Sequence, residues 1–275
     1  MQAIVQPETA VIYINIAIVR YERGDYTMAM ECYGKALEII NTFEREQEIL
    51  AKIYSGIAIV YNAKREYSDS IEYHRKALNI RKQVLGPNHP STATSYNGIG
   101  EVYREQGNYE KAISYLIDAC EVREEKLGIN HPSTAISYNN LGLAYEGKGD
   151  HAMALEYLKK ALSVKENVLG TDHPSTATAY SNIAVVCHSK RDFGNALKYS
   201  MKALKIRKRV LKADHIGIAN SYYNIAGIYD ALEEYEKALD YYKKALPIFT
   251  AKLGEEDPRT RDIRHRISII KMSYL

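Results

Sequence analysis

The 275-residue sequence has no tryptophan, only three phenylalanines and only three cysteines. The cysteines, Cys32, Cys120 and Cys187, form no Cys-x-x-Cys pair and are odd in number, so we expect no disulfide framework. The sequence also has no Asn-x-Ser/Thr glycosylation site. These absences favour a reducing compartment and predict a cytoplasmic protein whose cysteines are small buried apolar residues.

Neither sign of charge dominates, because 37 lysine and arginine residues stand against 34 aspartate and glutamate residues. A net charge of +3 predicts no nucleic-acid partner. The most apolar stretch, residues 10–19, is about half of the roughly 20 residues that a membrane-spanning helix needs. We therefore expect no membrane insertion, and we find no secretory signal to read.

Sequence signatures of catalysis are missing as well. The chain has no Gly-x-Gly-x-x-Gly, no P-loop, no His-Glu-x-x-His and no Gly-x-Ser-x-Gly, so we expect no enzyme and no cofactor. Four histidines recur, at positions 89, 131, 173 and 215. Equivalent points of neighbouring helical repeats lie on the order of 10 Å apart, which is too far for ligands of one metal ion, so we predict no metal site. We expect these histidines to help begin a helix ahead of proline.

Tyrosine is abundant, with 24 residues, and its spacing reveals a repeat. The segment His-Pro-Ser-Thr-Ala begins at His89, His131 and His173, which gives a period of 42 residues. Tyrosines 54, 96, 138, 180 and 222 follow the same period. Six units result, followed by a helix at residues 258–275 that would cap the array; the units are about residues 7–47, 48–89, 90–131, 132–173, 174–215 and 216–257.

Each unit has the pattern of a helical hairpin. In the fourth unit, apolar residues at helical spacing follow Pro132 and stop at Gly149-Asp150. We name this segment helix A. A second apolar stripe stops at Leu169-Gly170, where glycine suits the left-handed residue that ends a helix, and we name it helix B. Pro247 lies inside the last helix B and should kink or end it. The sequence thus predicts an all-α protein.

These motifs resemble a known family. The order Gly142, Tyr145, Gly149, Ala154 and Ala161 resembles the tetratricopeptide repeat, and Leu127-Gly128-Ile129-Asn130-His131-Pro132 is similar to the 42-residue repeats of kinesin light chain and nephrocystin-3. The resemblance implies a right-handed superhelical solenoid whose helices A line a concave groove. It also implies a protein-protein interaction scaffold or cargo adaptor that binds a peptide segment of its partner.

An asparagine column marks the candidate site. Asn15, Asn140, Asn182 and Asn224 share one position of helix A, and the cap places Arg266 there. Asparagine is a poor residue for the middle of a helix, and its amide can bind peptide backbone. In kinesin light chains the residue at this place binds peptide, so the resemblance nominates this column. The alternative is a ladder that ties neighbouring helices A together.

Gly56 and Gly98 replace asparagine in the second and third repeats, which should leave room there and centre the site on repeats four to six. The candidate positions beside the column are mixed polar and apolar: Asn97, Asn139, Thr178, Ser181, Asn220, Tyr223, Leu143 and Val185. Acidic residues offset the basic ones nearby, so we do not expect a strong preference for acidic ligands.

Two basic sets invite a functional interpretation, but we expect solvated surface for both. Arg81, Arg123, Lys165 and Arg207 form a column near the ends of the helices B, where cations complement the helix dipole. The denser set could bind an acidic partner; it comprises Lys202, Lys205, Arg207, Lys208, Arg209 and Lys212.

The first helix is apolar on several sides, with Ile12, Ile16 and Val19 among its residues. This pattern suggests cover by another segment or by a second copy, and we hypothesise a homo-oligomer formed through this helix.

Two functional alternatives stand beside the peptide-binding scaffold. One is a sensor or regulatory arm of a larger signalling protein, and the other is a self-assembling structural protein.

Overall fold

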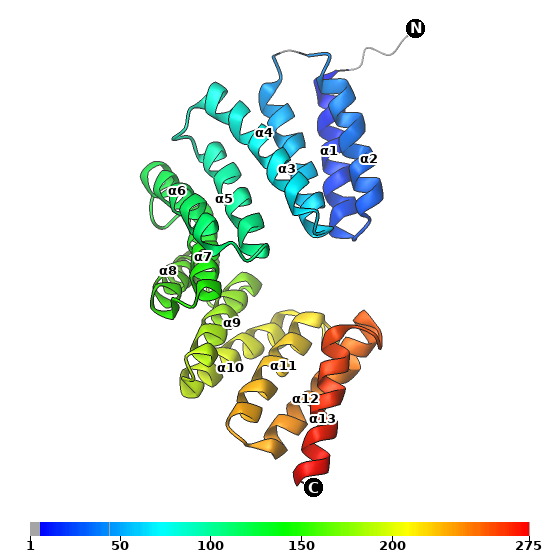
Figure 1. Cartoon of the computed structure of the whole chain (residues 1–275), viewed down its shortest axis with the longest axis vertical. Coiled ribbons are helices and arrows are strands. Elements are labelled where there is room, and N and C mark those ends of the chain that lie inside the picture. Colours follow the sequence, from blue (N-terminus) through cyan, green and yellow to red (C-terminus); the bar gives the residue numbers. More distant parts are fainter. Residues whose placement is uncertain (1–5, 44, 275) are drawn as a thin grey trace. The chain divides into compact units, whose positions relative to one another are not determined.

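A computed structural model describes residues 6–43 and 45–274, and within these ranges the chain forms thirteen α-helices and no strand (Figure 1). Glu44, inside the predicted first repeat, and Leu275, at the end of the predicted cap, lie outside the described residues. The chain divides into two compact units between Lys148 and Gly149. The fold is an all-α repeat solenoid, as the sequence predicted.

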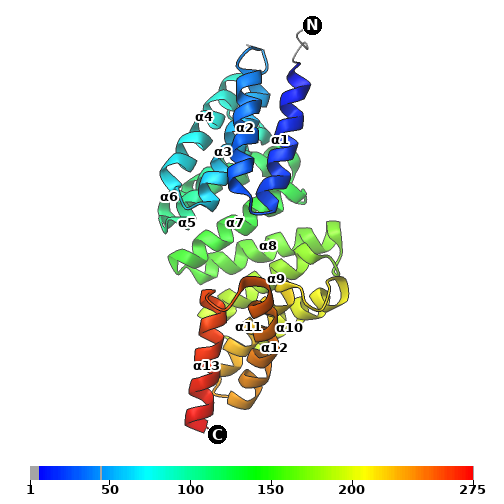
Figure 2. The ribbon, with the colours of Figure 1, turned by 90° about the vertical axis from the view of Figure 1, so that its right-hand side faces the viewer.

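The first unit holds seven helices in which consecutive pairs pack together as hairpins, α1 with α2, α3 with α4 and α5 with α6. The helices are α1 (Pro7–Glu22), α2 (Tyr26–Ile40), α3 (Gln47–Ala63), α4 (Tyr67–Leu85), α5 (Pro90–Glu105), α6 (Tyr109–Leu127) and α7 (Pro132–Lys148). The second unit pairs α9 with α10 and α11 with α12, and α13 packs on α12 (Figure 2). Its helices are α8 (His151–Leu169), α9 (Pro174–Ser189), α10 (Phe193–Val210), α11 (Ile216–Ala231), α12 (Tyr235–Leu253) and α13 (Pro258–Tyr274).

The recurring histidines begin helices, as predicted. Nδ1 of His89 accepts a hydrogen bond from the backbone N–H of Ser91 at 3.1 Å, and His173 accepts one from Ser175 at the same distance. His131 and His215 make equivalent bonds to residues 133 and 217. The imidazole therefore satisfies one of the four backbone N–H groups that a helix start leaves without an intrahelical acceptor.

A glycine with positive φ follows most of the helices B, but its ψ is extended rather than left-handed helical. Gly170 has φ 86° and ψ 165°, a combination that residues with a Cβ rarely adopt, and positions 86, 128 and 254 are similar. In the fifth repeat Lys212 holds the equivalent position, and α10 ends at Val210 with Leu211 already extended. The helix end thus moves where the glycine is missing.

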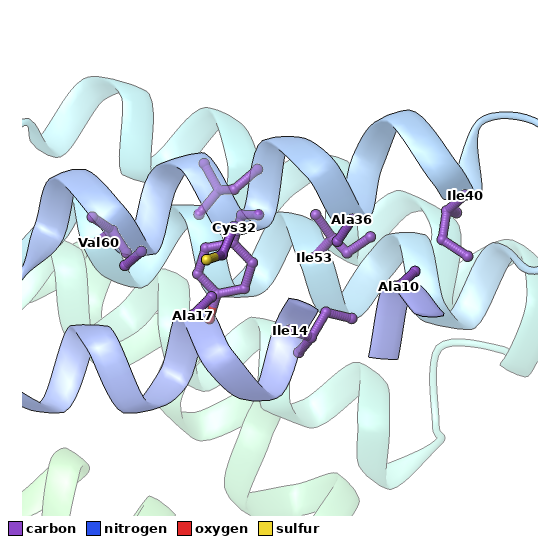
Figure 3. Packing of buried hydrophobic residues seen from close by; sticks show 11 residues of the cluster. Ala10, Ile14, Ala17, Cys32, Ala36, Ile40, Ile53 and Val60 are labelled. Carbon is purple, nitrogen blue, oxygen red and sulfur yellow. The ribbon is translucent and has the colours of Figure 1, made fainter. Parts of the chain in front are cut away.

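The core of the first unit shows why small residues recur between the helices. Ala10, Ala17 and Ala36 have no exposed surface, and they allow the helices to approach closely around Ile53 and Val60 (Figure 3). Cys32 is buried in the same cluster, and Cys120 and Cys187 are also buried and free, as expected.

Tyrosines of helices A and B pack against each other within a hairpin. The rings of Tyr61 and Tyr73 are stacked with centroids 5.5 Å apart, and those of Tyr103 and Tyr115 are stacked at 5.8 Å. In the second unit the rings of Tyr229 and Tyr241 repeat this geometry at 5.8 Å. The tyrosine columns are therefore packing residues, which accounts for their strict period.

The prediction that the basic column is solvated is wrong for its arginines. Arg81 is 7% exposed, and its Nη1 donates to Ser55 Oγ at 3.0 Å and to Ser95 Oγ at 2.6 Å. Arg123 on α6 and Arg207 on α10 likewise link the helices on either side of them. Burial lowers the pKa of all three guanidinium groups. Each arginine thus joins its own hairpin to the next one.

Pro247 does not end α12, which continues to Leu253. The proline ring removes a backbone N–H and crowds the carbonyl of Lys243, but both side chains are exposed, so water can solvate that carbonyl. Ala245 and Phe249, on the buried side, have no exposed surface and hold the helix in place.

Helix α1 exposes much of its apolar surface. Ile12 is 58% exposed, and four further aliphatic side chains of α1 are 39% to 46% exposed, namely Val11, Ile16, Ile18 and Val19. Among the described residues, no helix is long and apolar enough to cross a membrane.

Candidate functional site

The glycines of the asparagine column face side chains of the preceding helix B. A Cβ on Gly56 would lie 2.3 Å from Cζ of Tyr33, and a Cβ on Gly98 would lie 2.5 Å from Cε1 of His74. The expectation that these glycines leave open room is therefore wrong, because Tyr33 and His74 fill the space. Burial lowers the pKa of His74 from 6.5 to about 4, with Arg81 as a second cause.

Asn140 lies in a ladder rather than in an open groove. Only 8% of the residue is exposed, and its Nδ2 donates a long hydrogen bond of 3.4 Å to Oδ1 of Asn97, which is 7% exposed. Nδ2 of Asn139 in turn donates to Oδ1 of Asn140 at 3.3 Å. These contacts between α5 and α7 match the alternative interpretation of the column for this part of the chain.

The second unit contains a cavity of about 430 Å³ where the column continues. Helices α9, α10, α11, α12 and α13 all contribute to its wall. Three predicted site residues line it, namely Tyr223, Asn224 and Arg266. The apolar part of the wall includes Ala184, Val185, Ile228 and Ala231. The volume lies within the range of about 300–1,000 Å³ that is typical of ligand sites.

Two carboxylates and one guanidinium give the cavity its charge. Nη1 of Arg266 lies 3.3 Å from Oδ2 of Asp230, and its Nε lies 3.9 Å from Oδ1 of Asp262. The side chain of Asp230 is 17% exposed, that of Asp262 38% and that of Arg266 50%. Asp230 is therefore the least exposed of the three side chains, and the three groups together carry one negative charge.

Two tyrosine hydroxyls donate to these carboxylates. Tyr223 Oη lies 2.8 Å from Oδ2 of Asp262, and Tyr242 Oη lies 3.4 Å from Oδ2 of Asp230. Burial, with the hydrogen bond to Asp262, raises the pKa of Tyr223 to about 12, and burial raises the pKa of Tyr242. Both phenols remain protonated donors at neutral pH and hold the carboxylates in place.

Ser200 is the third polar feature of the wall. It is 3% exposed, and its Oγ has no hydrogen-bond partner among the described residues. Its position in the repeat is the one that Tyr33, His74, Leu116 and Leu158 occupy in the earlier repeats and Tyr242 in the next. Leu116 and Leu158 are completely buried, so replacement of a bulky side chain by serine accounts for space beside Asn224.

The other predicted residues lie outside this cavity. Ser181 accepts a hydrogen bond from Nη1 of Arg207 at 2.9 Å, which is a structural contact. Thr178 is exposed and donates to the carbonyl of Pro174 at 3.3 Å. Asn182 and Asn220 are half-buried on α9 and α11, and Asn15 is exposed on α1. The structure thus gathers only the C-terminal members of the predicted set.

The dense basic set is partly occupied with contacts of its own. Arg207 is the linking arginine described above, and Nη1 of Arg209 lies 2.7 Å from Oδ2 of Asp172. The ammonium groups of Lys202 and Lys208 lie over the rings of Tyr180 and Tyr222 at 4.9 and 5.4 Å. These contacts favour the interpretation of this set as an ordinary outer helix face.

Comparison with known families settles the relationship of the chain. Tetratricopeptide repeat models match residues 10–43 and, in overlapping segments, residues 49–125, 99–167, 133–199 and 175–251. The chain belongs to the tetratricopeptide repeat family. A search of curated proteins gave no match.

Solved tetratricopeptide structures share this fold at low sequence identity. The nearly identical repeats of a Podosopora anserina protein described as a kinesin light chain are 20% identical, with a TM-score of 0.65 over 76% of this chain and 99% of theirs. BtubC (BKLC) from P. vanneervenii is 20% identical, with a TM-score of 0.70 over 83% and 91%. A Rap protein complexed with Competence and Sporulation Factor is 18% identical, with a TM-score of 0.68 over 96% and 75%.

At this identity these likenesses establish the tetratricopeptide fold alone. Proteins of the family are generally protein-binding scaffolds without catalytic activity. Sequence reasoning found Tyr223, Asn224 and Arg266 but missed Ser200, Asp262 and Tyr242 in the cavity wall. An alignment of the repeats could have indicated Ser200, because the other repeats have a large residue at that position.

Proposed function

We propose that the protein is a non-enzymatic adaptor that binds a peptide segment of a partner in the cavity of its second unit, as a kinesin-light-chain-like scaffold in the cytoplasm. The observation that carries this proposal is the cavity itself, which brings Asn224, Arg266 and Tyr223 together beside apolar wall residues. Amide and guanidinium groups can bind peptide backbone, while the apolar wall accepts a side chain. The free cysteines agree with a reducing compartment.

A solved neighbour supports a binding role. The similar Rap protein is complexed with Competence and Sporulation Factor, so an array of this fold can hold another molecule. Peptide capture would use the exposed guanidinium of Arg266 and the half-buried amide of Asn224. Asn140 has a smaller share in the proposal, because its amide is committed to Asn97.

The test is a random peptide library screened against the wild-type protein and Asn224→Ala, with circular dichroism showing equal helix content. Peptides that bind the wild type and lose affinity for the variant support the proposal. If neither protein selects a peptide, or if selected peptides bind both equally, the cavity is not the peptide site.

A second candidate function is self-assembly through α1. It is favoured by the five exposed aliphatic side chains of that helix, which form an uncovered apolar surface on the first unit. In this proposal a second copy covers the surface, and the assembled protein presents more than one peptide site.

A further inference from the structure

Two repeat positions face each other at the cavity, and, unlike in the other repeats, neither of the residues that occupy them there is large. One position lies on helix B and holds Tyr33, His74, Leu116, Leu158, Ser200 and Tyr242 in turn. The other lies on the next helix A and holds Gly56, Gly98, Asn140, Asn182, Asn224 and Arg266. Large residues face glycine at the first two steps, as the contacts of Tyr33 and His74 show. Ser200 and Asn224 are a pair without a large member, and the cavity opens there.

The charge of the wall indicates what this space accepts. Asp230 and Asp262 share the single guanidinium of Arg266, and the other ionisable side chains of the described lining are the exposed His188 and the phenols of Tyr223 and Tyr242. Asp230 is the more buried carboxylate and pairs with Arg266 at 3.3 Å, whereas Asp262 lies 3.9 Å from the same guanidinium, so one cation serves two carboxylates and the wall keeps a net negative charge. A cationic group would complement it.

The uncharged surface of the cavity fits the rest of a basic side chain. Val185, Ile228 and Ala231 provide apolar contact for a methylene stem. Oγ of Ser200 is buried without a partner and can accept a hydrogen bond, and an unsatisfied buried hydroxyl has a cost that a donor from a ligand removes. An ammonium or guanidinium group carries donors and no acceptor, which matches two carboxylates and a free hydroxyl oxygen.

We propose that the cavity is a specificity pocket for a lysine or arginine side chain of the partner peptide, formed because serine replaces leucine at position 200 and charged by Asp230 and Asp262. This inference rests on the proposed function and names the residue that the partner inserts. An acidic side chain directed at Arg266 is the competing ligand, and the net charge of the wall disfavours it.

The experiment uses phage-displayed random peptides of twelve residues, panned on the whole protein, on two pocket variants and on one control variant. Ser200→Leu restores the residue that repeats three and four carry, so it should fill the pocket without disturbing the fold. Asp230→Asn/Asp262→Asn removes the negative charge and keeps similar shape. Lys198→Ala, which changes an exposed residue of the same helix, is the matched control.

The wild type and Lys198→Ala should enrich peptides with lysine or arginine at one fixed position. Replacing that residue by norleucine should weaken binding roughly ten- to a hundredfold, as expected for loss of a charged hydrogen-bonded group. Both pocket variants should lose the enrichment and bind the synthetic basic peptide correspondingly weakly.

Selected peptides with no basic position, or with aspartate or glutamate at the fixed position, would overturn the pocket assignment while leaving the peptide-binding function standing. The same holds if Ser200→Leu binds the basic peptide as well as the wild type does. Failure of every protein to select any peptide would instead refute the proposed function, so the two failures are distinguishable.

Discussion

Nη1 of Arg123 lies 2.7 Å from Oγ of Ser137, so an arginine that is only 5% exposed joins α6 to α7. The same side chain reaches Oγ1 of Thr94 on α5 at 3.2 Å. Linking arginines at this position occur three times in the described chain, buried at Arg81 and Arg123 and half-buried at Arg207, and they connect successive hairpins where an array has only nearest-neighbour contacts.

Arg123→Ala should therefore lower the free energy of unfolding by about 2–4 kcal/mol, because it removes hydrogen bonds and leaves Ser137 without its donor. Urea unfolding followed by circular dichroism measures the change. Lys126→Ala is the control, since that exposed side chain should contribute less than about 1 kcal/mol. Equal effects of the two substitutions would show that the linking role is mistaken.

Gly98→Ala should destabilise the protein by about 1–3 kcal/mol because the added Cβ would meet the ring of His74. In a His74→Ala background the same substitution should become neutral or stabilising by about 0.5–1 kcal/mol, the usual gain of alanine over glycine in a helix. Thermal denaturation of the four proteins of this double-mutant cycle tests the coupling. Additive effects would contradict it.

Acidification should destabilise the fold through His74. Burial lowers its pKa from 6.5 to about 4, so the unfolded chain binds a proton in this range while the folded protein does not. The contribution of this group to stability is complete above pH 6.5 and falls by up to about 3 kcal/mol as the pH approaches 4. His74→Leu, which imitates Leu116, should remove this part of the pH dependence. Parallel stability profiles of the two proteins between pH 4 and 7 would refute the prediction.

The exposed face of α1 should drive self-association. Sedimentation velocity of the wild type is expected to show a mass that rises with concentration, whereas Ile12→Glu/Ile16→Glu should remain monomeric because the charges cannot be buried in an apolar interface. Glu38→Gln on α2 is a control that changes an exposed charge elsewhere in the first hairpin. A wild-type monomer at high concentration would eliminate this second function.

Asparagines of one column should have different roles. Asn224→Ala is expected to reduce peptide affinity because Asn224 lines the cavity, while Asn140→Ala should mainly reduce stability, by about 1 kcal/mol, because its partner is Asn97. Fluorescence anisotropy with a selected peptide, combined with thermal melting, separates the two effects. A reversed pattern would place the binding site in the first unit.

The period of 42 residues was enough to predict the hairpins, because equivalent positions have similar neighbours in successive repeats. Helix starts at histidine followed from the same pattern, and the burial of the free cysteines was predicted from their small number and spacing. The prediction that the basic column is solvated was wrong for its arginines. Cations near a helix end usually lie in water, whereas Arg81 donates to hydroxyl groups on two other helices. That arrangement depends on contacts between hairpins, which a single repeat does not show.

The candidate site was predicted only in part for a similar reason. Asn224 and Arg266 stand in the asparagine column and line the cavity, but the column does not reveal which members face open space. That depends on the residue opposite, which is Tyr33 for Gly56 and His74 for Gly98. Comparing the two columns position by position would have pointed to Ser200.

The most direct test of the central claim is to locate a bound peptide on the protein. A selected peptide carrying a benzophenone group can be photo-cross-linked and its attachment sites mapped by mass spectrometry. The account predicts attachment to α9, α11 and α13 around the cavity, and loss of this attachment when unlabelled peptide competes. Attachment confined to the first unit, or spread over the surface without competition, would contradict it.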